Sequence, residues 1–184
     1  MIGGTTRHEC VSRPVEAAAA AVEFHQVEPG VDFKIGDTHI LPIALNHPFG
    51  AVGYRIECDG SSWAYVSDTA PFDLVLHKQH FLKGVEPLSD DDKLALASMR
   101  EALVRRIEGV DTVVYDTHFM PDEYAKFPHY GHSTPDQALE ICQAAKVRRL
   151  VLYHHAPSHT DEQMDKIAAE YLAKGAGVNV EVLT

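Results

Sequence analysis

The segment from Gly131 to His155 constrains the fold of this chain most, because a loop, a helix and a strand follow one another in it. Thr134 is a natural N-cap, Pro135 suits the first helical turn, and Gln137 can complete a capping box. The helix then repeats apolar residues at helical spacing. Val147 to Tyr153 is an apolar run typical of a strand that is covered on both faces. This order of elements predicts an α/β fold.

Histidines stand at both ends of this segment. His154 and His155 directly follow the apolar run, and His132 lies in the loop before the helix. In open α/β sheets, binding sites form outside the carboxyl ends of the strands. The sequence therefore predicts that these histidines lie where a functional site would form.

The remaining chain continues the same pattern. A single domain over 1–184 is expected, with 1–30 as a poorly defined lead-in and 31–184 as the folded part. Strands are predicted at 31–35, 38–45, 51–58, 63–67, 110–115 and 178–183. A helix is expected after Ser89, with an apolar stripe that begins at Leu94 and ends near Gly109, and another from Thr160 to Lys174.

Polar side chains follow four of the predicted strands. His47, Asp68, Asp116 and His154 each stand just past a strand, and His132 lies on a neighbouring loop. Imidazoles and carboxylates are ligands that suit zinc, manganese or iron. Each residue alone also has a structural explanation, as a turn residue before proline, a cap or a surface histidine. Their coincidence at four strand ends favours a metal site.

The motifs around these residues resemble those of the metallo-β-lactamase-fold hydrolases, in the branch that contains RNase Z and small phosphodiesterases. The resemblance covers about 31–159 and rests on LNHPFGAVGYRIE, YVSDTAP and LVLYHHAP. It implies an α/β fold of the four-layer αββα sandwich type. It also implies that His47, Asp68 and His154 bind divalent metal, with Asp68 bridging two ions. His155, one residue later, fits the last ligand position less well.

Two further motifs, GHST and VVYDTHF, extend the resemblance to the catalytic groups. They imply that His132 protonates the leaving group and that Asp116 orients His132. The metal expected from the resemblance is zinc, with manganese or iron as alternatives. The implied activity is metal-dependent hydrolysis of a phosphodiester-like small molecule.

The sequence departs from the family pattern upstream of His47. The first metal motif of the family, H-x-H-x-D-H, is absent, and His8, His25 and His39 are isolated. We therefore expect a sandwich that is incomplete at its N-terminus, without a second metal site, as in a truncated gene, a mis-called start or a split protein. The expected partner is a missing N-terminal half or a second copy of the chain. Weak metal binding and little hydrolysis are expected.

Charge and spacing narrow the expected substrate and compartment. The net charge of −11 disfavours binding to polyanions, so nucleic-acid binding is not expected. One hairpin fills the short interval between His47 and Asp68, which leaves no space for a long RNA-gripping arm. Three cysteines without a CxxC pair indicate a cytoplasmic protein with reduced thiols. No apolar run is long enough to span a membrane.

Two other interpretations stay open at this point. A non-catalytic binding or scaffolding domain could keep the fold without a functional metal centre, and the metal content of the purified protein would distinguish it from a hydrolase. A generic Rossmann-like protein is a weaker alternative, because the sequence contains no GxGxxG after a first strand.

Overall fold

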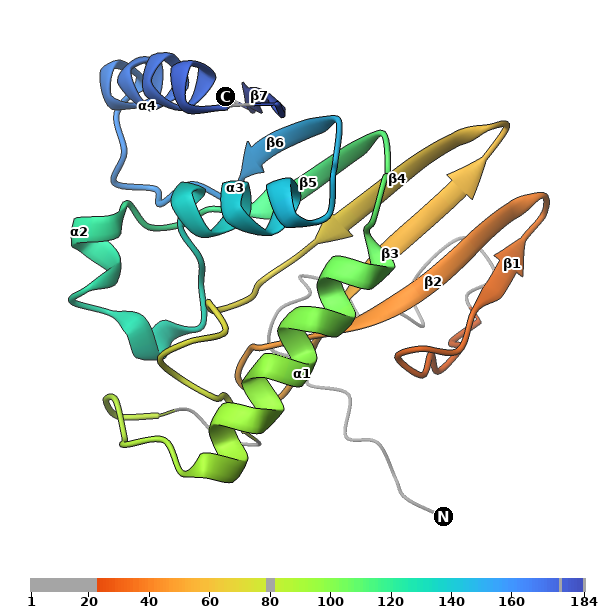
Figure 1. The fold of residues 1–184 in the computed structure, drawn as a ribbon, viewed down its shortest axis with the longest axis horizontal. Coiled ribbons are helices and arrows are strands. Elements are labelled where there is room, and N and C mark those ends of the chain that lie inside the picture. Colours follow the sequence, from red (N-terminus) through yellow and green to blue (C-terminus); the bar gives the residue numbers. More distant parts are fainter. Residues whose placement is uncertain (1–22, 79–81, 176, 184) are drawn as a thin grey trace.

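In the part of the chain that the structure describes, seven strands form one mixed sheet in sequential order (Figure 1). The computed structural model describes residues 23–78, 82–175 and 177–183. The strands are β1 (Phe33–Ile35), β2 (Thr38–Leu45), β3 (Ala51–Cys58), β4 (Ser61–Val66), β5 (Thr112–Asp116), β6 (Arg149–Tyr153) and β7 (Asn179–Val182). Neighbouring strands from β1 to β4 are antiparallel, and those from β4 to β7 are parallel. Of the predicted lead-in, 1–22 lie outside the described residues, and 23–30 contain no helix or strand.

The helices are α1 (Asp90–Arg106), α2 (Pro121–Tyr124), the 3-10 helix η3 (Pro128–Tyr130), α3 (Pro135–Ala144) and α4 (Asp161–Lys174). The three long helices α1, α3 and α4 begin where the sequence places their caps. The Ser89 hydroxyl accepts a hydrogen bond from the Asp92 amide at 3.1 Å, and the Thr134 hydroxyl caps α3 in the same way. These caps satisfy amides that the first helical turn leaves unpaired, so the starts of the helices are locally encoded.

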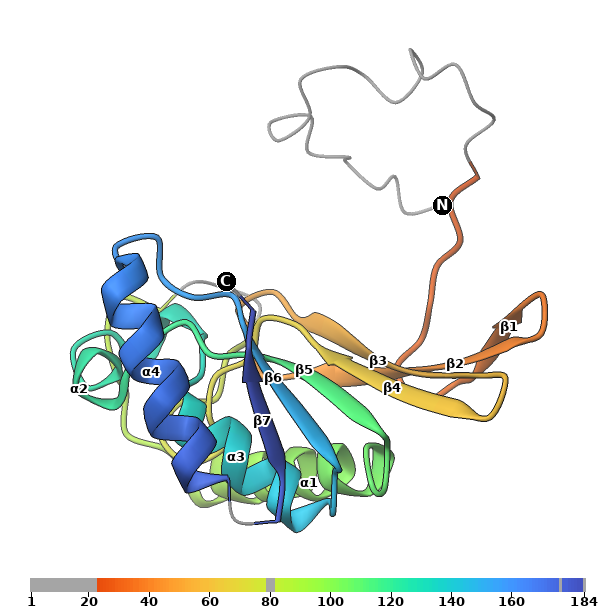
Figure 2. The ribbon, with the colours of Figure 1, turned by 90° about the horizontal axis from the view of Figure 1, so that it is seen from above.

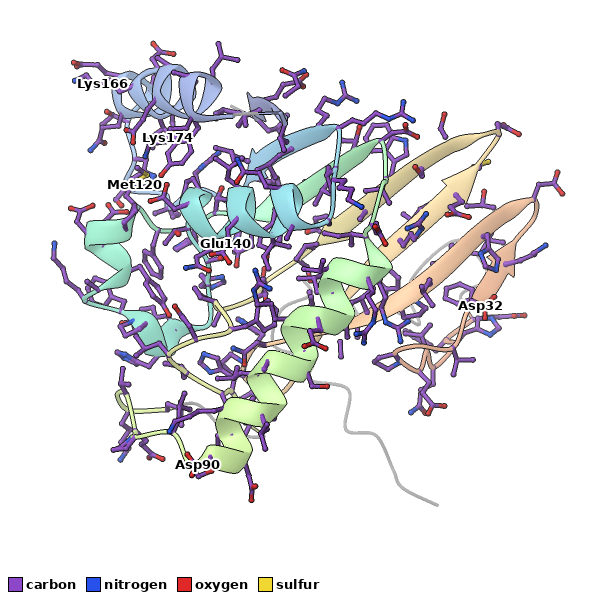
Figure 3. The ribbon with its side chains drawn as sticks, in the orientation of Figure 1. Asp32, Asp90, Met120, Glu140, Lys166 and Lys174 are labelled. Atoms are coloured by element: carbon purple, nitrogen blue, oxygen red, sulfur yellow. The ribbon has the colours of Figure 1, made fainter. Side chains whose placement is uncertain are left out.

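The long helices α1, α3 and α4 form a single layer on one face of the sheet (Figures 1 and 2). Glu140, which is labelled in Figure 3, lies on α3. It accepts a hydrogen bond from Arg100 of α1 at 2.7 Å, and the Tyr171 hydroxyl of α4 donates to Asp136 of α3 at 2.9 Å. Helix α3 therefore contacts α1 on one side and α4 on the other, and all three helices pack on the strands beneath them.

The hydrophobic core lies between this helical layer and the sheet. Its most deeply buried side chains come from both layers: Val66, Leu96, Leu103, Ile107, Val113, Ile141, Leu150, Leu152 and Tyr171. Leu94 does not belong to it, because its side chain is 69% exposed at the outer side of α1. The expected stripe therefore begins at Leu96, and its extension to Leu94 was wrong.

The opposite face of the sheet is not covered by the residues that the structure describes. Trp63, Tyr65 and Tyr153 are 46%, 38% and 37% exposed on this face. In β6 only Leu150 and Leu152 are fully buried, so the expectation of a strand covered on both faces was wrong for the described part of the chain. Of the four layers expected for an αββα sandwich, residues 23–78, 82–175 and 177–183 form one sheet and one helical layer.

No helix among the described residues is both long enough and apolar enough to cross a membrane.

Candidate metal centre

The predicted site residues converge at one edge of the sheet. Parallel strands β4, β5 and β6 end on the same side, and these ends lead into Asp68, Asp116 and His154. Strand β2 is antiparallel to β3, which is antiparallel to β4, so β2 points the same way as β4. Its end therefore brings His47 to the same edge. Because β2, β4, β5 and β6 all run in the same direction, residues that are distant in sequence meet at this end of the sheet.

The carboxylate of Asp68 lies between two of the histidines. Its Oδ2 is 3.9 Å from Nε2 of His47, and its Oδ1 is 3.5 Å from Nδ1 of His154. Ligand atoms of Asp68, Asp116, His132 and His154 all lie within 4.8 Å of one another. The tightest group of donor atoms thus contains both residues that the resemblance assigns to catalysis, whereas His47 lies at its margin. The individual roles of these residues stay predictions.

The ring of His47 is held in the tautomer that a metal ligand needs. Its Nδ1 lies 2.8 Å from the carbonyl oxygen of Gly131. A carbonyl can only accept, so Nδ1 carries the hydrogen and donates it, which leaves the lone pair on Nε2, the nitrogen nearest Asp68. The loop that precedes α3 therefore orients a side chain at the end of β2.

Gly131 makes this contact possible, and we expect Gly131→Ala to displace the His47 ring. An added Cβ would lie 2.5 Å from Cδ of Pro48 and 2.7 Å from Nδ1 of His47, and the backbone φ of +92° already disfavours alanine. We expect a loss of about 1–3 kcal/mol in the free energy of unfolding. Urea denaturation measures this loss, and Gly84→Ala, with nothing within 4 Å of its added Cβ, is the control. Equal stability of the two variants would contradict the tight packing described here.

His154 presents an unpaired nitrogen to two carboxylates. Its Nδ1 is buried without a hydrogen-bond partner, 3.5 Å from Asp68 and 3.4 Å from Asp116. The carboxylate of Asp116 raises the pKa of His154, and burial opposes this effect. A buried nitrogen without a partner, facing two carboxylate oxygens, fits the donor set of a divalent cation. The residues present are therefore compatible with a metal ion at this position.

His118 supports His154, and sequence reasoning did not identify it. Nδ1 of His118 donates to the carbonyl oxygen of His154 at 2.9 Å, and the Ala156 amide donates to the His118 carbonyl at 3.2 Å. His154 has a left-handed backbone with a φ of +62°, a conformation that costs energy for a residue with a side chain. His118 follows Asp116 by two residues in VVYDTHF, and that position was the available signal.

Asp116 is the most deeply buried residue of the cluster and holds its neighbours by hydrogen bonds. Its side chain is 1% exposed and accepts hydrogen bonds from the Thr69 amide at 3.0 Å and from Nδ1 of His132 at 3.0 Å. Burial alone would raise the pKa of Asp116, but the His132 hydrogen bond and the nearby His154 outweigh it and lower the pKa. Because an ionised carboxylate only accepts, Nδ1 of His132 must be protonated, and Nε2 remains the nitrogen available to other groups.

Asn46 joins the end of β2 to the loop that follows Asp68, and sequence reasoning missed it as well. Its side chain is buried and donates to the carbonyl oxygens of Pro71 at 3.0 Å and Val75 at 2.7 Å. Its Oδ1 accepts from the His77 amide at 2.9 Å. The position of Asn46 directly before His47 gave no signal for this role. Its three contacts fix the spacing between two of the strand ends.

A family model for the beta-lactamase superfamily domain matches residues 95–155. Ribonuclease Z from Exiguobacterium sibiricum is 30% identical over 159 residues, which cover 75% of this chain and 53% of that protein. Ribonuclease Z from Methanopyrus kandleri is 27% identical over 158 residues, covering 81% of this chain and 55% of that protein. The chain thus spans about half the length of these curated relatives.

The names of these relatives count against the expectation that the chain does not bind nucleic acid. A ribonuclease acts on RNA, whereas the net charge and the short hairpin led us to expect no nucleic-acid binding. Overall charge is a weak guide here, because a metal site and local cations can bind a phosphate on an acidic protein. An RNA substrate therefore stays among the candidates for this chain.

Solved structures show the same fold. The metallo-beta-lactamase fold protein YhfI from Bacillus subtilis matches with a TM-score of 0.57 and 16% identity, over 86% of this chain and 52% of that one. A diphosphatase from the PhnP family matches with a TM-score of 0.51 and 16% identity, over 88% of this chain and 46% of that one. The expected α/β fold class is confirmed, the chain has the metallo-β-lactamase fold, and its sequence is similar to members of that superfamily.

Proposed function

We propose that this chain carries the general acid and part of the metal site of a metal-dependent phosphodiester hydrolase. The observation that supports this most is the hydrogen bond between His132 and the buried Asp116, placed beside the carboxylate of Asp68. A histidine oriented by a carboxylate next to a metal-binding group is an arrangement suited to cleavage of a phosphate ester.

In this proposal His47, Asp68 and His154 hold the metal. Nε2 of His47 and Nδ1 of His154 are the nitrogens that lie nearest the two oxygens of Asp68. Nitrogen and oxygen donors of this kind favour zinc, with manganese or iron as alternatives. When bound, the metal would lower the pKa of a water molecule and neutralise charge on the phosphoryl oxygens.

His132 supplies the proton that the leaving oxygen needs. Asp116 fixes Nδ1 of His132 as a donor, so the second proton of an imidazolium sits on Nε2 and can be given to the leaving group. Asp116 also stabilises the charge that the imidazolium carries. Gly131, with a φ of +92°, turns the chain immediately before His132. This turn places the His132 ring in the cluster with Asp68, Asp116 and His154.

A small organic phosphodiester is the substrate class that we favour, because the interval between His47 and Asp68 contains only the β3–β4 hairpin and no RNA-gripping arm. RNA is the second candidate, and the names of the relatives support it. A non-catalytic domain that has kept the fold without metal is the alternative from another class. The amount of metal that the protein binds separates this alternative from both enzymes.

Metal titration is the first test, and we expect weak binding of at most one ion per chain. Cobalt(II) added to the apoprotein should give visible absorption bands that saturate at this ratio. His154→Ala should lower the affinity by more than about 100-fold, because even the loss of an outer partner of a ligand costs about 10–100-fold. His25→Ala is the control, since the His25 side chain is 79% exposed outside the cluster.

Different outcomes support different functions. Cobalt binding that His154→Ala and His25→Ala leave equally unchanged would contradict the metal site, and a complete lack of binding would favour the scaffolding alternative. With bound metal, we expect slow hydrolysis of bis-p-nitrophenyl phosphate. Two ions per chain together with fast turnover would contradict the expectation that part of the metal site is missing. Cleavage of structured RNA in preference to small esters would assign the second candidate.

A further inference from the structure

Residues 154–160, the connecting segment between β6 and α4, carry a proposed metal ligand at their first position. His154 has a left-handed backbone with a φ of +62°, a conformation that a residue with a side chain keeps only where its surroundings hold it. In this conformation Nδ1 of His154 lies 3.5 Å from Asp68 and 3.4 Å from Asp116. The contacts that hold the connecting segment therefore decide whether this ligand is in place.

Packing restrains the connecting segment only in part, because the segment borders a cavity. The cavity has a volume of about 450 Å³ and lies between the segment, the start of α4 and the C-terminal residues. The segment contributes His154, His155, Ala156 and His159 to its walls, and Met164 and Leu183 belong to the other walls. Side chains beside open space make fewer packing contacts than those in a close-packed core. The conformation of the segment therefore depends on its hydrogen bonds.

The chain that follows β5 holds the connecting segment at both ends. Near the start of the segment, His118 contacts the backbone of His154 and Ala156. Near its end, Nε2 of His159 lies 3.0 Å from each carboxylate oxygen of Glu123 in α2. The side chain of His159 is 4% exposed, so water hardly competes for this contact. Glu123 thus ties the end of the segment to α2.

Glu123 is the single polar partner of the His159 ring among the residues that the structure describes. An ionised carboxylate only accepts, so Nε2 of His159 carries the hydrogen and donates it. Nδ1 of His159 is buried without a partner. Glu123 is fixed in turn, because its Oε2 accepts a hydrogen bond from the Met120 amide at 2.7 Å. The position of a buried imidazole thus depends on one carboxylate.

We propose that Glu123 and His159 form a positioning pair that keeps His154 in its metal-binding conformation. This inference rests on the proposed function, in which His154 holds the metal, and it adds two residues outside the group of close ligand atoms. Without the pair, the end of the connecting segment can move into the cavity. The backbone of His154 can then leave the left-handed conformation, and its ring turns away from Asp68.

His159→Leu separates this positioning role from a structural one. Leucine fills a similar volume and removes the unpaired Nδ1 together with the hydrogen bond to Glu123, so the urea midpoint should change little. A metal that binds only the held conformation loses affinity by the factor by which that conformation becomes rarer. We therefore expect the Kd for cobalt(II) to rise by about 5–30-fold, which corresponds to the usual preference against a left-handed residue.

Glu123→Gln tests the other member of the pair. The amide oxygen of glutamine can still accept hydrogen bonds from Met120 and His159 but carries no charge, so the Kd for cobalt(II) should rise by about 2–5-fold. The double variant should bind cobalt(II) no more weakly than His159→Leu alone, because that change has already broken the pair. Glu123→Gln also keeps the inference testable if His159→Leu does not fold.

A matched control removes a histidine–carboxylate pair elsewhere in the molecule. Nε2 of His39 lies 2.6 Å from Asp32, and both residues are outside the group of close ligand atoms. His39→Leu should therefore leave the Kd for cobalt(II) at the wild-type value. Asp122→Asn, at an exposed position beside Glu123, should do the same.

The backbone ¹³C chemical shifts of His154 provide a measurement that needs no metal. In the metal-free wild type they should indicate a left-handed residue. In His159→Leu they should move toward the values of an ordinary loop residue, whereas in His39→Leu they should stay the same. This measurement reports the conformation of His154 directly, which a general loss of stability would not change.

The outcomes separate this inference from the proposed function. If the wild type binds cobalt(II), and His159→Leu changes neither the His154 shifts nor the Kd, the inference is overturned and the proposed function stands. If the wild type binds no cobalt(II), but the His154 shifts move in His159→Leu, the proposed metal site is refuted and the positioning pair is supported. An equal rise of the Kd in His159→Leu and His39→Leu would also overturn the inference.

Discussion

Asn46→Ala is expected to lower the free energy of unfolding by about 3–6 kcal/mol, because it leaves three buried backbone groups without their partners. These groups are the carbonyl oxygens of Pro71 and Val75 and the amide of His77. A loss of this size is a large fraction of the stability of an ordinary domain. Urea denaturation followed by circular dichroism measures it.

Two further variants define the cause of this loss. Asn46→Asp keeps the shape and the acceptor oxygen but turns a buried carboxylate oxygen toward two carbonyl oxygens, so it should destabilise the protein at least as much as Asn46→Ala. Asn179→Ala removes the same side chain from an exposed position in β7 and should change stability by less than about 0.5 kcal/mol. If Asn46→Ala and Asn179→Ala cost the same, Asn46 does not hold the two strand ends together.

His132→Gln is expected to slow the metal-dependent hydrolysis of a phosphodiester with an alkyl leaving group by about 10²–10⁴-fold, the usual contribution of a general acid. Nε2 of His132 supplies the proton in the proposed mechanism, and glutamine is too weak an acid to replace it. Single-turnover rates at saturating metal and excess protein make the measurement practical for slow hydrolysis.

The leaving group gives this prediction its control. A p-nitrophenolate departs without protonation, so His132→Gln should slow hydrolysis of bis-p-nitrophenyl phosphate by about tenfold or less. His129→Gln alters a histidine of η3 outside the group of close ligand atoms and should leave both rates unchanged. An equal loss with both esters in His132→Gln would show that His132 does not act as the general acid.

Much of the fold could be predicted from the sequence because its signals are local. Strands β2 and β3 match the predicted ranges 38–45 and 51–58, because β2 is a continuous strand-like run, β3 alternates apolar and polar residues, and the Asp59-Gly60 turn ends β3. Helices α1, α3 and α4 start at their predicted caps. The features that the sequence did not predict depend on how the helices and layers pack against one another. The exposure of Leu94 depends on where α1 packs, and the open face behind Tyr153 depends on which layers are present.

The site, like the fold, could be predicted only in part from the sequence. Strand order implies that His47, Asp68, Asp116 and His154 share one edge, and the structure places them there. Sequence spacing carries no information on side-chain partners, so it could not reveal that Asn46 holds a loop or that His118 holds the His154 carbonyl. The cavity beside Met164 also depends on how α4 and the C-terminal segment approach β6.

The contact between His47 and Gly131 has a consequence for how the chain folds. It joins residues that are 84 positions apart in sequence, and the group around Asp116 requires that β4, β5 and β6 have already paired in parallel. Contacts of such long range are slow to form, because the intervening chain must first lose its freedom. The cluster would therefore assemble last, and a spectroscopic signal from bound metal would report the final step of refolding.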